Sequence, residues 1–191
     1  MTGTELTECF DAAVRAYLAE RPAATVVALG EGLGTGFWRL DNGRLNWLTV
    51  QPPEPAALRR MLLPDDARRH TVGCGPADHR WLDAVAEPRR GVVVVARGVR
   101  RRLAPCQVRD LVAACAGRFP GGVLLLDAPA WWTPALAGCH PGIAAVRALR
   151  PPGVRHRLPV VRALLPVVCE VRFAAGGSAA ANPAARRTYC R

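Results

Sequence analysis

The feature of this sequence that most constrains its fold is a short apolar strand that runs directly into a glycine-rich turn. Thr25–Leu29 has the uninterrupted, β-branched pattern of a buried parallel strand, and Gly30–Gly36 follows with glycine at every second position. Glycine lets the backbone bend sharply and approach a ligand closely. Because ligands of open α/β sheets bind at the carboxyl ends of the strands, this turn is the first candidate for a site.

Two common phosphate-binding signatures do not fit this turn. A P-loop requires Gly-Lys-Ser/Thr after the glycines, and no such sequence follows. The dinucleotide fingerprint requires an acidic residue at the end of the second strand, whereas the predicted strand Leu45–Val50 is followed by Gln51. The turn therefore predicts a binding site of an α/β domain without naming its ligand.

Strand-like and helix-like segments alternate along most of the chain. Strands are predicted at Thr25–Leu29, Leu45–Val50, His70–Cys74, Gly91–Ala96 and Gly122–Asp127, and helices at Leu6–Leu18, Glu54–Leu63, Asp78–Val85 and Pro105–Phe119. This order predicts a Rossmann-like α/β fold, with a mostly parallel twisted sheet and helices on both faces.

The pattern weakens beyond Ala130. Here we expect a helix at Pro141–Leu149 and a final antiparallel edge strand at Val167–Ala174. Residues 1–174 are predicted to form a single domain, a size that allows a full hydrophobic core. The remaining residues, 175–191, are rich in Gly, Ala and Ser and predict a flexible tail.

The composition excludes several classes of protein. No apolar run reaches the roughly 18–20 residues that span a bilayer, and the N-terminus lacks the basic region of a secretory signal. We therefore expect a cytoplasmic protein that does not associate with a membrane. The seven cysteines are widely spaced without a CxxC pair, and the four histidines lack metal-ligand spacing. We therefore expect neither a disulfide framework nor a metal site.

The net charge of +11 comes entirely from arginine, because the chain contains no lysine. Together with abundant Ala, Gly and Pro, this bias is typical of a GC-rich coding sequence, which weakens a functional interpretation of the arginines. The cluster Arg97–Arg102 either binds a polyanion or forms a solvated face. It lacks aromatic residues for base stacking, so we expect no specific nucleic-acid partner.

Several separated blocks between Phe10 and Trp132 carry a resemblance in order and spacing. They are VVALGEGLGTGFWRL at the first turn, PPEPAALRRMLLP after the second strand, DHRW at Asp78–Trp81, then VVVVARGV and FPGGVLLLD. The sequence resembles the leucine carboxyl methyltransferase family, in particular its polyketide O-methyltransferase branch. The resemblance implies a class I methyltransferase fold and S-adenosylmethionine as the cofactor.

The sequence also departs from the pattern of that family. Members typically read GAGLDTRFWRL, DVDLPEV and AEGVLMYL after the first, second and fourth strands. Gly34 and Gly36 stand where the family has Asp and Arg, and Gln51 where it has an Asp that binds the ribose hydroxyls. Arg97 replaces a Glu near the positively charged methionine portion. An amide accepts more weakly than a carboxylate, and Arg97 reverses a charge, so we expect an eroded cofactor site.

Members usually carry several tens of residues before the helix that precedes the first strand, and these cover the cofactor. Here only 21 residues precede Pro22, so the chain is short at this end relative to the family. A homo- or hetero-oligomeric partner that supplies the cover stays an open alternative.

The resemblance implies a set of cofactor contacts. These are Gly30, Gly32, Leu33, Gln51, Asp78, which would accept from the adenine amino group, and Arg97, which would meet the methionine carboxylate. Asp78 has the alternative role of a helix N-cap.

Three further residues have two interpretations each. Glu31 is either a cofactor contact or, as we expect, a solvated loop residue. Trp131 and Trp132 follow the fifth strand and either line a substrate pocket or pack in the core. No residue of the sequence is identified as catalytic.

Two functions remain. The first is an S-adenosylmethionine-dependent O-methyltransferase acting on a small molecule, a polyketide-like carboxylate or phenol, in which positioning for in-line displacement supplies much of the rate. The alternative is a non-catalytic, methyltransferase-like binding or assembly protein. A polyanion-binding role rests on charge alone.

Overall fold

The computed structural model describes residues 3–98, 101–150 and 166–176. The described strands form one seven-stranded sheet in the order β3-β2-β1-β4-β5-β7-β6. They are β1 (Thr25–Leu29), β2 (Asn46–Gln51), β3 (Arg69–Gly73), β4 (Val92–Ala96), β5 (Val123–Pro129), β6 (Ile143–Leu149) and β7 (Pro166–Phe173). Strands β1 to β5 pair in parallel, and β7 runs antiparallel to both β5 and β6. The predicted mostly parallel Rossmann-like sheet is confirmed.

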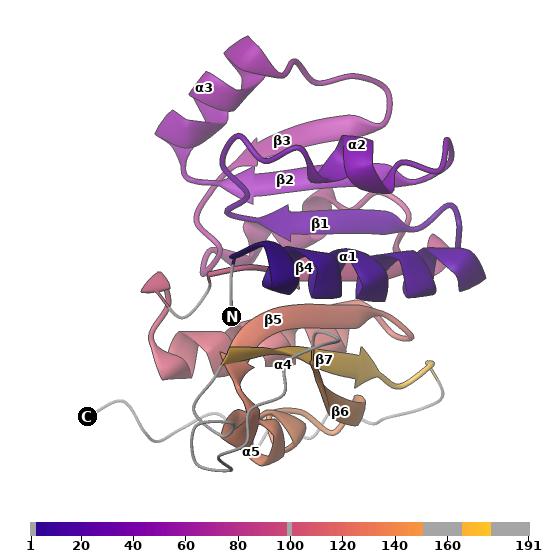
Figure 1. Cartoon of the computed structure of the whole chain (residues 1–191), viewed down its shortest axis with the longest axis vertical. Coiled ribbons are helices and arrows are strands. Elements are labelled where there is room, and N and C mark those ends of the chain that lie inside the picture. Colours follow the sequence, from indigo (N-terminus) through magenta and orange to yellow (C-terminus); the bar gives the residue numbers. More distant parts are fainter. Residues whose placement is uncertain (1–2, 99–100, 151–165, 177–191) are drawn as a thin grey trace.

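Helices cover both faces of this sheet. The α-helices are α1 (Gly3–Glu20), α2 (Gly36–Leu40), α3 (Pro53–Leu62), α4 (Pro105–Arg118) and α5 (Thr133–Ala137), and the 3-10 helices are η1 (His79–Ala84), η2 (Pro88–Arg90) and η4 (Ala130–Trp132). Figure 1 shows α1 crossing one face in front of β4, with α4 behind the sheet. None of the described helices is both long and apolar enough to cross a membrane.

The alternation of side chains along the strands builds one core on each face. On β1, Val26 belongs to the cluster that includes Phe10 of α1, while the next residue, Val27, belongs to the cluster that includes Leu111 of α4. Successive strand residues point to opposite faces, so a continuous apolar strand fits only a sheet that is covered on both sides. The sheet is therefore packed between two helical layers, which set the positions of the loops at its strand ends.

Two predictions for the last part of the sheet are wrong. Pro141–Leu149 was expected as a helix but contains strand β6, whose Ala-rich sequence favours a helix locally. Pairing with β7 overrides that preference. The segment Val167–Ala174 does form an antiparallel strand, yet β7 lies between β5 and β6, and β6 takes the edge.

Two other differences are smaller. Helix α2 was not predicted, because five residues after a glycine-rich turn carry little periodicity. The helix expected near Asp78–Val85 is the 3-10 helix η1. Of the predicted flexible tail, residues 177–191 lie outside the described residues.

Candidate functional site

A cleft of about 560 Å³ opens at the carboxyl ends of β1 and β4, the two neighbours where the strand order reverses. Its walls come from distant parts of the chain: Phe10 from α1, Gly30 from the turn after β1, Arg97 from the segment after β4, and Asp127 from β5. Sites for small molecules typically measure about 300–1,000 Å³. The cleft therefore has the size and the place expected of a ligand site in an open α/β sheet.

The turn after β1 is shaped by two glycines with positive φ. Gly30 and Gly32 have φ values of 67° and 64°, a region that other residues rarely adopt. The amide of Gly30 donates to the carbonyl of Val50 at 2.7 Å, which ties the turn to the end of β2. A Cβ atom added to Gly32 would meet no atom within 4 Å, and the neighbouring Leu33 is 48% exposed. This part of the turn is open to a ligand.

Glu31 is not a solvated loop residue, so that expectation is wrong. Its Oε1 accepts from the amide of Gly36 at 2.8 Å, and its Oε2 accepts from the indole Nε1 of Trp47 at 3.2 Å. The guanidinium of Arg59 lies 3.5 Å from Oε2. Burial raises the pKa of Glu31, while the charge of Arg59 and the two hydrogen bonds act in the opposite direction. Glu31 therefore fills the inside of the turn.

Arg59 of α3 reaches the same turn from its other side. Its side chain is buried, and its Nη1 donates to the carbonyls of Gly32 at 2.6 Å and Gly34 at 3.1 Å. Nothing in the sequence singles out Arg59, because it is one of two adjacent arginines on a helix. A contact across 25 to 27 positions leaves no local pattern.

Gln51 ends β2 with a buried and incompletely satisfied amide. The residue is 1% exposed, and its Nε2 donates to the carbonyl of Pro55 at 2.8 Å. Its Oε1 has no hydrogen-bond partner among the described residues. Buried acceptors are nearly always paired, so this oxygen fits a donor that a ligand supplies, such as a hydroxyl group.

Asp78 stands at the N-cap of η1, directly after the loop that follows β3. It accepts from the backbone amide of Arg80 at 3.2 Å and from the Nε of Arg80 at 2.9 Å. These hydrogen bonds lower the pKa of Asp78 below its ordinary value. The N-cap role is therefore present, and the carboxylate, which is partly exposed and paired with the guanidinium of Arg80, stays ionised for a further donor.

The arginine cluster lies at the cleft instead of forming only a solvated face. Arg97, Arg101 and Arg102 all line the cleft. Arg97 donates to the hydroxyl of Thr7 at 2.6 Å, and its guanidinium lies 5.6 Å from the ring centroid of Phe10. Arg102 donates to the carbonyl of Gly30 at 2.7 Å. The cleft thus has a cationic rim.

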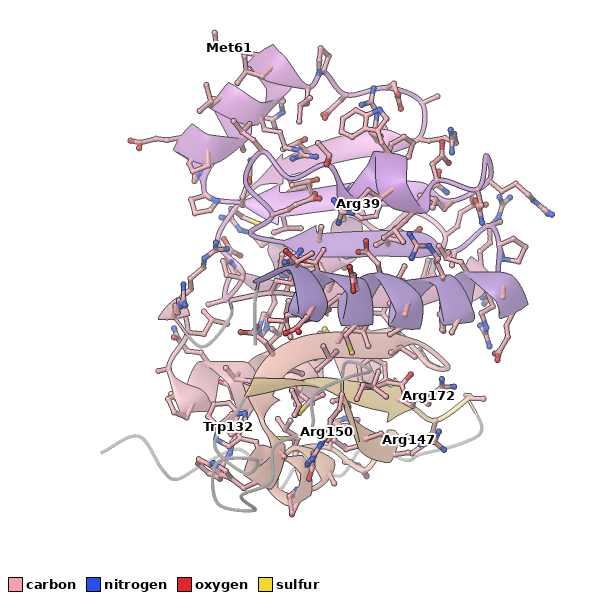
Figure 2. All side chains as sticks on the ribbon, in the orientation of Figure 1. Arg39, Met61, Trp132, Arg147, Arg150 and Arg172 are labelled. Carbon is pink, nitrogen blue, oxygen red and sulfur yellow. The ribbon has the colours of Figure 1, made fainter. Side chains whose placement is uncertain are left out.

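Trp131 and Trp132 lie apart from this cleft, beside a smaller apolar pocket of about 170 Å³. The two rings meet edge to face with centroids 6.0 Å apart. Pro105, Val108 and Arg109 of α4 form the opposite wall, and Figure 2 shows Trp132 at the end of the sheet away from Arg39. Trp132 packs against the core, as one interpretation expects, while Trp131 is 63% exposed, and a substrate pocket at these rings stays a prediction.

The structure brings some of the predicted site residues together and separates others. Gly30 and Arg97 line the cleft, while Gly32 and Leu33 sit on the same turn without lining it. Gln51 and Asp78 follow at the ends of the neighbouring strands β2 and β3. Within the described part of the chain, no three His, Cys, Asp or Glu side chains group closely enough to hold a metal ion.

The chain resembles a known protein over part of its sequence. No family model matches the chain. Its sequence is 30% identical over 119 residues to the tetracenomycin polyketide synthesis O-methyltransferase TcmP of Streptomyces glaucescens. The match covers 61% of this chain and 43% of TcmP, so it spans less than half of the relative's length.

Two solved structures share the fold at low sequence identity. A candidate methyltransferase from Thermobifida fusca superimposes with a TM-score of 0.65 at 17% identity, covering 90% of this chain and 81% of that one. The 1,6-didemethyltoxoflavin-N1-methyltransferase of Burkholderia thailandensis, solved with S-adenosylhomocysteine bound, gives a TM-score of 0.57 at 15% identity, covering 89% and 78%. The strand order and these likenesses show that the chain has the Rossmann-like class I methyltransferase fold.

Proposed function

We propose that this chain binds S-adenosylmethionine in the cleft after β1 and transfers its methyl group to an oxygen atom of a small acceptor. The observation that carries the proposal is the open glycine turn bordering a 560 Å³ cleft at the point where the strand order reverses. The sequence likeness to an O-methyltransferase of polyketide synthesis supports oxygen as the accepting atom.

Residues of this chain fit the parts of such a cofactor. The unpartnered Oε1 of Gln51 would accept from a ribose hydroxyl, and the ionised Asp78 would accept from the adenine amino group. Gly30, Gly32 and Leu33 form the turn along which the cofactor would lie, and Arg97 stands where a carboxylate would be neutralised. When bound, the cofactor supplies an electrophilic methyl group.

The acceptor side is proposed at Trp131 and Trp132. Their pocket is separate from the cleft, and in the sequence Arg102 of the cleft and Pro105 of the pocket are three positions apart. Indole rings stack on planar aromatic groups, and Arg109 at the pocket wall would pair with an anionic oxygen. A carboxylate acceptor is already ionised at neutral pH, whereas a phenol must lose a proton. A polyketide-like acid or phenol suits this surface.

The non-catalytic alternative is favoured by one specific contact. The Nη1 of Arg102 lies 1.6 Å from the position that a Cβ atom of Gly30 would occupy, so the guanidinium fills the space in front of the turn. Cationic side chains at this rim also repel a sulfonium. In this alternative the fold is kept for binding or assembly, and no methyl transfer takes place.

Calorimetric titration with S-adenosylmethionine and S-adenosylhomocysteine tests the proposal. We expect binding in the micromolar range, with S-adenosylhomocysteine the tighter ligand because it lacks the sulfonium charge. Asp78→Ala should weaken binding by about tenfold or more, since it removes a charge-assisted acceptor. Asp83→Ala serves as the control, because Asp83 lies on the same helix η1 and, among the described residues, its carboxylate pairs with Arg118 alone, at 3.4 Å.

The outcomes separate the two functions. Absence of heat with both compounds at millimolar concentration would overturn cofactor binding. Binding of both compounds, without methyl transfer to a panel of naphthols and naphthoic acids, would favour the non-catalytic alternative. Transfer to a member of the panel that falls in Trp131→Ala would support the proposed acceptor side.

A further inference from the structure

We propose that Arg59 and Glu31 are positioning residues for cofactor binding, which from inside the turn after β1 fix the path of residues Gly30–Gly36. This role rests on the proposed function, since it concerns the turn along which the cofactor would lie. The sequence offered Glu31 as one possible cofactor contact, and Glu31 also lines the cleft, whereas it assigned no role to Arg59.

Arg59 holds the carbonyl groups of the turn. One nitrogen of its guanidinium donates to both Gly32 and Gly34, and a second nitrogen lies near the carboxylate of Glu31. The planar fork of an arginine serves three acceptors at once, which the single ammonium of a lysine cannot do with the same geometry. A side chain of α3 thereby determines where the peptide groups of the turn point.

Glu31 holds the far end of the turn and anchors it to the sheet. It accepts from the amide of Gly36, the first residue of α2, and from the indole of Trp47 on β2. A buried charge needs a partner and hydrogen bonds, and Glu31 has both in Arg59 and these two donors. The pair is thus a single unit that joins β2, α2 and α3 through the turn.

The glycines of the turn divide into two groups by what surrounds them. A Cβ atom at Gly34 would lie 2.5 Å from Cγ of Glu31, and one at Gly36 would lie 2.6 Å from its Oε1. These two positions are glycine because the side chain of Glu31 occupies their space. Gly32 is different, since a Cβ atom there would meet nothing within 4 Å. Gly34 and Gly36, which also line the cleft, thus leave room for the side chain of Glu31, whereas Gly32 has open space beside it.

The pair also leaves part of the turn available. The carbonyls of Gly32 and Gly34 and the amide of Gly36 are taken. Within the described part of the chain, no acceptor meets the backbone amides of Glu31, Gly32 and Leu33. Arg59 and Glu31 therefore hold the turn in one conformation and leave these backbone amides available to a ligand. A turn that is ordered beforehand loses less conformational entropy when the ligand binds.

The experiment measures the turn with and without ligand. Arg59→Met is compared with Arg60→Met, its neighbour on α3, which donates to the carbonyl of Thr71 and contacts Asp65. We expect Arg59→Met to raise the dissociation constant for S-adenosylhomocysteine by about tenfold or more, because misplaced binding groups lose affinity steeply. In the ligand-free protein, hydrogen exchange at the amide of Gly36 should speed up by a similar factor. Arg60→Met should change both quantities by less than about twofold.

Two further variants guard against loss of folding. Arg59→Met leaves the charge of Glu31 buried without its partner, which by itself destabilises the fold. The double variant Glu31→Gln with Arg59→Met removes that charge and still lacks the hydrogen bonds of Arg59 to the carbonyls of Gly32 and Gly34. Arg59→Lys keeps the positive charge and should give an intermediate shift. In the double variant and in Arg59→Lys, the amide hydrogen of Gly36 should exchange faster than in the wild type.

The results decide the proposal separately from the proposed function. Wild-type protein that binds neither compound would overturn the proposed function, and exchange at Gly36 would still test the positioning role. Unchanged exchange at Gly36 in Arg59→Met and in the double variant would overturn the positioning role. Faster exchange with an unchanged dissociation constant would show that the pair orders the turn without serving the ligand, and would equally overturn it.

Discussion

The two ends of the candidate site are built in different ways. At the end of β1, the turn is held by buried polar groups: Glu31 and Arg59 make three hydrogen bonds to backbone atoms and pair with each other. At the end of β5, Trp131 and Trp132 meet edge to face, and Trp131 is largely exposed. Removing one side chain from a buried polar network leaves its partners unsatisfied and costs much stability. Removing one side chain from an apolar surface costs only the contacts that this side chain made.

This difference matches the two tasks that a methyl-transferring site has. A cofactor that does not vary is best recognised by a preorganised turn, because preorganisation removes the cost of ordering at binding. The proposed acceptor surface, made of rings and the guanidinium of Arg109, would suit a class of molecules instead of a single one. We therefore expect stability to depend on the turn and acceptor choice to depend on the tryptophans.

The largest effect is expected at Gly36. Gly36→Ala would place a Cβ atom 2.6 Å from Oε1 of Glu31 and 2.8 Å from the ring of Trp47, so the buried network must shift. We expect a loss of about 2–3 kcal/mol in the free energy of unfolding, measured by urea denaturation. Gly75→Ala, where a Cβ atom would meet nothing within 4 Å, should change it by less than about 0.5 kcal/mol. Equal effects of the two substitutions would mean that the turn is not tightly built.

The tryptophans should show a smaller and unequal effect. Trp132 packs against the core, so Trp132→Ala should cost about 1–2 kcal/mol of unfolding free energy, whereas the exposed Trp131→Ala should cost less than about 0.5 kcal/mol. The same urea titration measures both. A loss at Trp131 as large as that at Gly36 would remove the contrast between the two ends of the site.

The sequence predicted the parts of the fold that local patterns determine. Strand β1 matches its predicted bounds, because Thr25 and four apolar residues run without a break into a glycine turn and favour a buried strand. Strand β6 was missed because IAAVRAL has no alternation of buried and exposed residues, and only its pairing with β7 makes it a strand. Local patterns thus predict elements that bury their own side chains, but not an edge strand that depends on its neighbour.

The candidate site divides in the same way. The turn and Gln51 could be found, because they follow predicted strands directly. The partnership of Glu31 with Arg59 could not, since 28 positions separate them. It also changes the meaning of the departures from the family pattern. A carboxylate and a cation still meet at this turn, since Glu31 lies within it and Arg59 reaches it from α3.

The pH dependence of stability tests the buried network around Glu31 in the turn after β1. Because burial raises the pKa of Glu31 in the folded protein, the unfolded chain releases this proton first as the pH rises. Between the ordinary carboxyl pKa and the raised one, the folded state binds more protons, so its stability falls with rising pH. The cost of Glu31→Gln, measured by urea denaturation, should therefore be greatest near about pH 4 and shrink as the pH rises to about 7. A cost that grows with pH would mean that the charge of Arg59 dominates and holds the pKa of Glu31 low.

The smallest perturbation is labelling of the cysteines, which compares the two ends without a mutation. Cys106 begins α4 beside the tryptophan pocket and is partly exposed, whereas burial raises the pKa of Cys9 on α1, close to the cleft. Burial likewise raises the pKa of Cys169 on β7 to about 11. Because the thiolate is the reactive form, iodoacetamide at neutral pH should modify Cys106 first, and Cys9 and Cys169 only in urea. Peptide mass spectrometry resolves each site, and early labelling of Cys9 would show that α1 opens away from the cleft in the native protein.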